Sequence, residues 1–164
     1  MKKFFFCAIL AFLSISCFAQ LNVTKANTKI EKIGTLRSAY AWMYCQGTDY
    51  YLYIRTSNQF DDPTLFCLGE TAETSIQTAK DMIAAIDNIE YNASLEVSDA
   101  KGIGALLVKK KIVGSPYWDI LQESRAGTSN ITPKELQTAI KIITEHSGIA
   151  LSNESNTQPE NDEN

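Results

Sequence analysis

A tight chain reversal at Gly47 is the feature that most constrains how this 164-residue chain can fold. The segments Tyr40 to Cys45 and Tyr50 to Arg55 are rich in aromatic and β-branched residues, which favours two strands. If Gly47 begins a two-residue type II′ turn between them, the register of the hairpin is fixed. The predicted pairs are Cys45 with Tyr50, Met43 with Leu52, and Ala41 with Ile54.

Alternation along this hairpin predicts two unlike faces, because successive side chains of a strand point to opposite sides of the sheet. One face carries aliphatic residues and is expected to be buried. The other is the ring face, which consists of Tyr40, Trp42, Tyr44, Tyr51, Tyr53 and Arg55. Such a surface can stack sugar rings or peptide side chains, with Arg55 free for a carboxylate or a cation–π contact. The alternative is packing under loops, under the other half of the chain or against a second subunit.

The first 19 residues are typical of a bacterial signal peptide. Lys2 and Lys3 precede the apolar run Phe4 to Leu13, and Cys17-Phe18-Ala19 provides a small residue at the cleavage position. The run is too short for a membrane span, which needs roughly 20 apolar residues. We therefore expect cleavage after Ala19 and export to the periplasm or beyond. A lipid anchor at Cys17 is the alternative, although Ser14 stands where a lipobox prefers a large aliphatic residue.

Composition divides the rest of the chain into three parts. Residues 20–28 are expected to be a flexible leader, 29–150 a single α+β domain, and 151–164 a disordered acidic tail that has too few apolar residues to fold. The formal net charge is −4, and removal of Lys2 and Lys3 makes it more negative. This charge argues against nucleic acid or an anionic membrane as the main partner.

The periodicity of the domain predicts strands and helices in two similar series. A first strand spans Ile30 to Leu36, and Leu65 to Leu68 forms a strand before a helix capped by Thr71 or Thr74. Further strands are predicted at Leu95 to Val97, Ile103 to Val113 and Tyr117 to Glu123, then a loop at Gly127 to Asn130. For Tyr117 to Glu123 a helix opened by Ser115-Pro116 is the alternative. A capping box of Thr132 and Glu135 begins a last helix, which ends at Gly148.

This order of elements indicates an α+β fold, with an antiparallel sheet and two helices packed on one of its faces. Two loosely similar halves, each a β-sheet plus a helix, are a further reading. An oxidising compartment suggests a disulfide between Cys45 and Cys67. In a simple meander, however, their strands lie on either side of Tyr50 to Arg55, roughly twice the ~4.8 Å strand spacing apart and beyond the ~7 Å limit for a bridge. The sequence leaves both alternatives open.

No segment nominates a catalytic, metal or cofactor site. His146 is the only histidine and lies at a helix end, and Asp61-Asp62 lacks the spacing of a calcium loop. Lys109 to Lys111 is expected to be a solvated strand edge, with an anion-binding patch as the alternative. The sequence favours a non-enzymatic binding module for a protein or glycan. The alternatives are an inhibitor of an extracellular hydrolase acting through the loop Asn58 to Pro63, or a small hydrolase whose carboxylates are unidentified.

Overall fold

The structure is a computed structural model that describes residues 29–56, 58, 60–122 and 127–149. The predicted signal peptide, the leader and the acidic tail lie outside the described residues. Within the described residues, no helix is long and apolar enough to cross a membrane.

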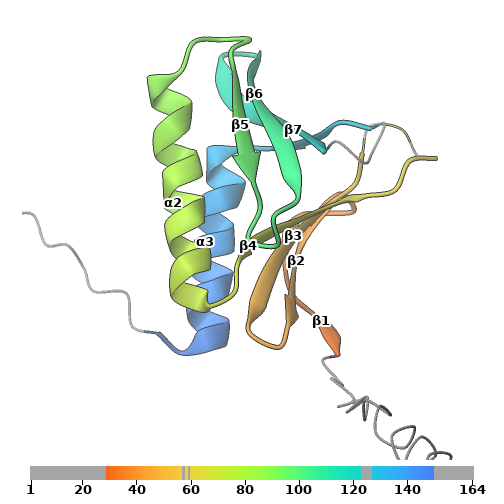
Figure 1. Cartoon of the computed structure of the whole chain (residues 1–164), viewed down its shortest axis with the longest axis vertical. Coiled ribbons are helices and arrows are strands. Elements are labelled where there is room, and N and C mark those ends of the chain that lie inside the picture. Colours follow the sequence, from red (N-terminus) through yellow and green to blue (C-terminus); the bar gives the residue numbers. More distant parts are fainter. Residues whose placement is uncertain (1–28, 57, 59, 123–126, 150–164) are drawn as a thin grey trace, which may run out of the picture.

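The chain builds the same series of elements twice, four strands followed by a helix (Figure 1). The first half contains β1 (Ile30–Arg37), β2 (Ala41–Gln46), β3 (Asp49–Ile54), β4 (Thr64–Gly69) and α2 (Ala72–Asn88). The second half contains β5 (Ser94–Ser98), β6 (Gly104–Ile112), β7 (Ser115–Gln122), β8 (Ser129–Ile131) and α3 (Pro133–Ser147). Each set of strands forms its own antiparallel four-stranded sheet in sequence order. The predicted α+β class is confirmed, and each half has its own sheet.

The hairpin at Gly47 has the predicted register. Ala41 pairs with Ile54, Met43 with Leu52 and Cys45 with Tyr50. The loop has two residues, since Gln46 pairs with Asp49. Gly47 has φ of 66° and Thr48 is not among the residues of positive φ, which fits a type II′ turn rather than type I′.

Capping residues set the helix boundaries as predicted. Thr71 caps α2 and forms a capping box with Thr74, and Thr132 and Glu135 form the capping box of α3. Gly148 ends α3 in the left-handed conformation, with φ of 71°. Residues 117–122 belong to strand β7, which excludes the helix alternative there.

The predicted loop from Gly127 to Asn130 is wrong at its end. Ser129 and Asn130 belong to β8 and pair with Ile120 and Asp119 of β7. A three-residue strand has no periodicity of its own, so it forms only because a neighbouring strand supplies the hydrogen bonds. The Ser129 hydroxyl also donates to Thr64 Oγ1 over 2.7 Å, which ties β8 to the first half.

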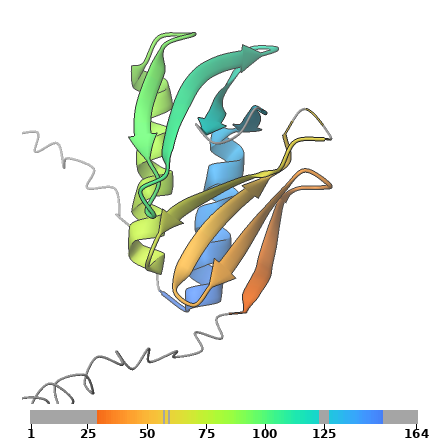
Figure 2. The same ribbon diagram turned by 45° about the vertical axis from the view of Figure 1, so that its right-hand side comes forward.

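Helices α2 and α3 lie side by side against the sheets (Figure 2), and buried residues from both helices and both sheets form one core. α2 packs on β4, and α3 packs on β1. Trp118 of β7 is fully buried, and its indole N–H donates to the Met82 carbonyl of α2 over 2.9 Å. The helices therefore bind the two sheets into one core.

Both described cysteines are free thiols in the structure. Cys45 pairs with Tyr50 and Cys67 pairs with Tyr51, so the two cysteines lie on opposite sides of strand β3. The sequence leaves open a disulfide or a simple meander, and the structure has the meander with both thiols free.

Candidate functional site

The ring face lies on the outer side of the first sheet, opposite the helices. Its members on β2 and β3, Trp42, Tyr44, Tyr51 and Tyr53, are partly buried, whereas Arg55 is exposed. Tyr40 is 56% exposed and precedes β2. The alternate residues of the same strands, such as Met43 and Leu52, are fully buried in the core. Alternation along the hairpin therefore separates the two faces as the sequence predicts.

Tyr53 is at the centre of the ring face. Its ring centroid lies 5.5 Å from that of Trp42 and 5.3 Å from that of Tyr44. Both pairs are tilted, at 59° and 48°, within the distance range at which aromatic side chains attract one another. The rings therefore form one contiguous cluster.

Two cations flank Trp42. Lys32 Nζ lies 5.1 Å from the centre of the indole ring, and Arg55 Cζ lies 5.5 Å from it. Both distances fit a cation–π contact. Within the described residues, neither side chain makes an ion pair. Sequence reasoning found Arg55 and missed Lys32, which pairs with Tyr44 across β1 and β2.

Two neighbouring hollows open on the ring face. The first, of about 500 Å³, is lined by Tyr40, Tyr53, Arg55, Thr56, Asn58, Asp61 and Pro63. The second, of about 420 Å³, is lined by Ile30, Tyr44, Gln46, Tyr51, Tyr53, Asp62, Pro63 and Leu65. Tyr53 and Pro63 line both. Both volumes fall within the range of about 300–1,000 Å³ typical of small-ligand sites.

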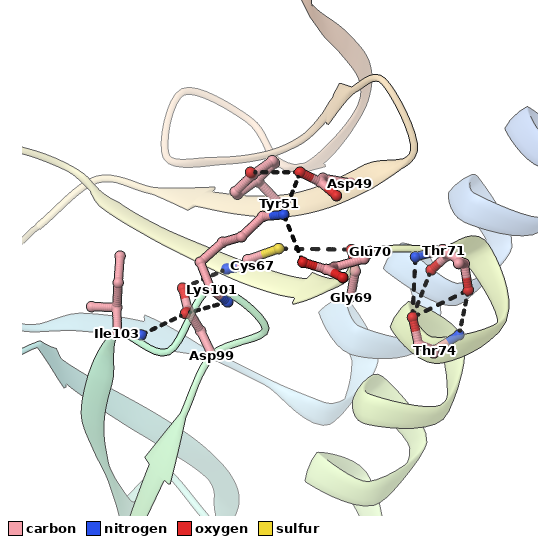
Figure 3. A network of polar contacts seen from close by, with 10 residues as sticks. All are labelled: Asp49, Tyr51, Cys67, Gly69, Glu70, Thr71, Thr74, Asp99, Lys101 and Ile103. Atoms are coloured by element: carbon pink, nitrogen blue, oxygen red, sulfur yellow. Dashed lines mark hydrogen bonds and ion pairs between the residues drawn. The ribbon is translucent and has the colours of Figure 1, made fainter. Parts of the chain in front are cut away.

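Tyr51 forms the boundary of the ring face, where the turn between β5 and β6 meets the first sheet (Figure 3). Its hydroxyl donates to Asp49 Oδ2 over 3.2 Å. Lys101 of the turn contacts the same carboxylate at 2.7 Å and Glu70 at 2.9 Å, which raises the pKa of Lys101. Partial burial raises the pKa of Tyr51 to about 12. The Tyr51 hydroxyl is therefore already bonded within the fold, although Tyr51 also lines the second hollow.

Other polar groups of the ring face are available to a ligand. In the part of the chain that the structure describes, the hydroxyls of Tyr40, Tyr44 and Tyr53 make no hydrogen bond. The first hollow adds the guanidinium of Arg55, the amide of Asn58 and the carboxylate of Asp61. Asn58 Nδ2 donates to Asp61 Oδ1 over 3.2 Å, which holds the two side chains together. The site therefore offers flat rings bordered by hydrogen-bond donors and acceptors.

The acidic residues Asp61 and Asp62 line the two hollows, and the histidine lines neither. Asp61 lines the first hollow and Asp62 the second. His146, near the C-terminal end of α3, contacts Tyr50, with 3.2 Å between Nδ1 and the tyrosine hydroxyl. Among the described residues, no group of three or more His, Cys, Asp or Glu side chains could hold a metal ion.

Comparisons with protein-family models, with curated proteins and with solved structures found no match for this chain.

Proposed function

We propose that this chain is a non-enzymatic binding module that holds a glycan against its ring face. The position of Tyr53 carries the proposal, because this ring contacts Trp42 and Tyr44 and forms a wall of both hollows. Two adjacent hollows that share a ring suit a ligand made of repeated rings. A chain of pyranose sugars has that form.

The chemistry of the ring face favours a sugar over a protein partner. A pyranose presents C–H groups on its faces, which the negative face of an aromatic ring attracts, and hydroxyls around its edge. The unbonded tyrosine hydroxyls, Arg55, Asn58 and Asp61 provide matching donors and acceptors. Protein interfaces have an apolar centre, whereas the large aliphatic residues of this surface, Ile30 and Leu65, lie only in the second hollow.

Calorimetric titration with a panel of neutral oligosaccharides tests the proposal. We expect Tyr53→Ala to weaken binding of the best ligand by about tenfold or more, as for aromatic hot spots. Tyr53→Phe keeps the ring and is expected to weaken binding by about two- to tenfold if the hydroxyl bonds the sugar. Tyr91→Ala is the matched control, because this tyrosine is 46% exposed and contacts Lys109 and Lys111 of β6, in the second sheet.

Two outcomes contradict the proposal. One is a Tyr53→Ala variant with the wild-type circular dichroism spectrum that binds every sugar ligand as tightly as the wild type does. The other is a wild-type chain that binds no oligosaccharide but captures a protein that Tyr53→Ala releases. The second result assigns the ring face to a protein partner.

Phe60 supports a second candidate function, inhibition of an extracellular hydrolase. Its side chain is 86% exposed, and Asn58 and Asp61 on either side of it in sequence line the first hollow. The Asn58 side-chain oxygen accepts from the Phe60 N–H over 3.2 Å, and the Asp61 N–H donates to the Asn58 carbonyl over 3.1 Å. A turn held by its own hydrogen bonds presents an apolar side chain as an inhibitor loop does. Hydrolase inhibition that is lost in Phe60→Ala and kept in Tyr53→Ala favours this candidate.

We also propose export, on the basis of the charged and apolar pattern of residues 2–19. Intact mass of the chain recovered from the periplasm of a bacterial host is expected to match a chain that begins at Gln20. A chain that begins at Cys17 with added lipid mass favours the anchor alternative. A full-length chain in the cytoplasm contradicts export.

A further inference from the structure

The lysine run of β6 does not form a solvated strand edge along its whole length. β6 lies between β5 and β7, so it is an inner strand. Lys109 is only 7% exposed, and its ammonium donates to the Ile89 carbonyl over 2.6 Å. The same ammonium lies 4.7 Å from the centre of the Tyr91 ring. Lys109 therefore joins β6 to the connection between α2 and β5.

Beyond this lysine, the β6–β7 turn exposes two aliphatic side chains. Ile112 is 59% exposed and Val113 is fully exposed. Ile112 pairs with Ser115 across a two-residue turn in which Val113 has φ of 45° and Gly114 has φ of 92°. Positive φ at both positions defines a type I′ turn, which prefers asparagine at the first. A β-branched residue is strained there. Val113 is therefore an aliphatic residue at a position where the backbone conformation and the full exposure to solvent both favour a polar side chain.

Cationic and aromatic groups surround this turn. Lys111 is exposed, and its Nζ lies 5.4 Å from the centre of the Tyr91 ring. Lys110 Nζ donates to Asn92 Oδ1 over 3.0 Å. Tyr91 is itself 46% exposed. The α2–β5 connection and the β6–β7 turn both lie at the top of Figure 1. We name Tyr91, Lys110, Lys111, Ile112 and Val113 the hairpin tip.

We propose that the hairpin tip docks on the surface of an anionic lipid bilayer. Ile112 and Val113 enter the boundary between headgroups and acyl chains, the lysines meet lipid phosphates, and Tyr91 takes the interfacial position that tyrosine favours. Two acidic residues adjoin this cluster: Glu90 precedes Tyr91 in the α2–β5 connection, and Asp119 of β7 interacts electrostatically with Lys110. The chain as a whole carries a formal charge of −4, so an anionic surface repels the rest of the molecule and selects an approach with the hairpin tip first.

A local readout tests the proposal, because the apolar segment from Phe4 to Leu13 would itself bind lipid. The full chain is mixed with bicelles of phosphatidylcholine and one-third phosphatidylglycerol that carry a nitroxide lipid. We expect the amide NMR signals of Ile112, Val113 and Gly114 to lose intensity while that of Thr48 persists. The loss should shrink in 0.5 M salt and in pure phosphatidylcholine. Tip signals that stay as intense as that of Thr48, or that fade equally in pure phosphatidylcholine, overturn the proposal.

Substitutions separate lipid contact from folding. Val113→Asn introduces the residue that the turn prefers, so its melting temperature should equal or exceed that of the wild type. We expect this variant to weaken the lipid effect at the tip about tenfold, and Lys111→Gln about fivefold. Ile103→Asn, at the other end of β6 and 44% exposed in the wild type, is the matched control and should leave the effect unchanged. A folded Val113→Asn variant with the full effect contradicts the proposal.

Discussion

Cys67 shows how a residue on the outer side of a sheet becomes fully buried. It pairs with Tyr51 of the ring face, yet its exposure is 0%. The turn between β5 and β6 covers it, since the Ala100 N–H donates to the Cys67 carbonyl over 3.0 Å. Sequence alternation predicts one buried face for β4, but Cys67 and Leu68 are both buried because the second half of the chain covers the other face.

The buried thiol of Cys67 predicts a loss of stability at alkaline pH. Burial raises its pKa from 9.0 to about 11. The folded state thus favours the protonated thiol, so its contribution is complete below pH 9 and is lost as the pH rises through about 11. We expect the urea midpoint to fall between pH 9 and 11, and the fall to be smaller in Cys67→Ala, whatever that variant's stability at pH 7.

The control for this titration is Tyr51→Phe. Burial raises the pKa of Tyr51 to about 12, so this phenol acts in the same direction but at a higher pH. Because an unfolded tyrosine has a pKa of 10.0, removal of this phenol should leave the slope between pH 9 and 10 nearly unchanged and reduce it only above pH 10. If Cys67→Ala keeps the full wild-type slope, the thiol is not the titrating group.

At the scale of elements, the carboxylate of Asp99 fastens the β5–β6 turn to strand β4. Asp99 is 6% exposed. Its Oδ1 accepts from the N–H groups of Lys101 and Ile103, each over 2.9 Å, and its Oδ2 accepts from the N–H of Cys67 over 3.2 Å. β4 is an edge strand of its sheet, so this side chain satisfies a donor that would otherwise lack a ladder partner.

We therefore expect Asp99→Ala to lower the free energy of unfolding by about 3 kcal/mol, because it leaves buried N–H groups without an acceptor. Asp99→Asn keeps one oxygen acceptor, so its free energy of unfolding should fall by less. Asp87→Ala, at an exposed position of α2, is the control and should change stability by less than about 0.5 kcal/mol. Urea titration at pH 7 measures all three. Equal stability of Asp99→Ala and the control would show that the turn does not depend on this carboxylate.

Elements whose signals are local could be predicted from the sequence. Gly47 and strict alternation define the β2–β3 hairpin, and the capping box at Thr132 defines the start of α3. For α2 the sequence leaves the cap open between Thr71 and Thr74, and Thr71 is the cap in the structure. Strand β8 could not, because its three residues depend on pairing with β7 and on the contact between Ser129 and Thr64. The sequence alone also did not decide between one sheet and two.

The candidate site also contains residues that the sequence predicts and residues that it does not. The six residues of the ring face follow from the hairpin register. Lys32 does not, because β1 has register irregularities between Lys32 and Gly34 and between Thr35 and Arg37, which interrupt alternation. Asn58 and Asp61 enter the first hollow from a loop whose position depends on the whole fold. The sequence therefore predicts the aromatic residues of the ring face but not the neighbouring residues that complete the site.

At the scale of the whole molecule, the two halves interlock. Arg37 of β1 donates to the side chain and the carbonyl of Asn130, each over 2.9 Å, and its Nε lies 3.0 Å from Glu135 of α3. β1 approaches α3 so closely that a Cβ on Gly34 would lie 2.5 Å from Ile142. The helix of the second half thus completes the core of the first, so neither half has a complete core of its own.

Such interlocking predicts a single cooperative unfolding transition, and the chain has a natural reporter for each half. Its two tryptophans are Trp42 in the first half and Trp118 in the second. Trp118→Phe leaves Trp42 as the fluorophore, and Trp42→Phe leaves Trp118. Loss of the bond from Trp118 to Met82 should lower the urea midpoint of the first variant. Within each variant, however, fluorescence and far-ultraviolet circular dichroism should give the same midpoint, since the surviving reporter unfolds with the whole molecule. A fluorescence midpoint that departs from the dichroism midpoint in either variant would instead mean that the duplicated halves unfold as separate units, and that the contacts of Arg37, Ser129 and Trp118 join them only weakly.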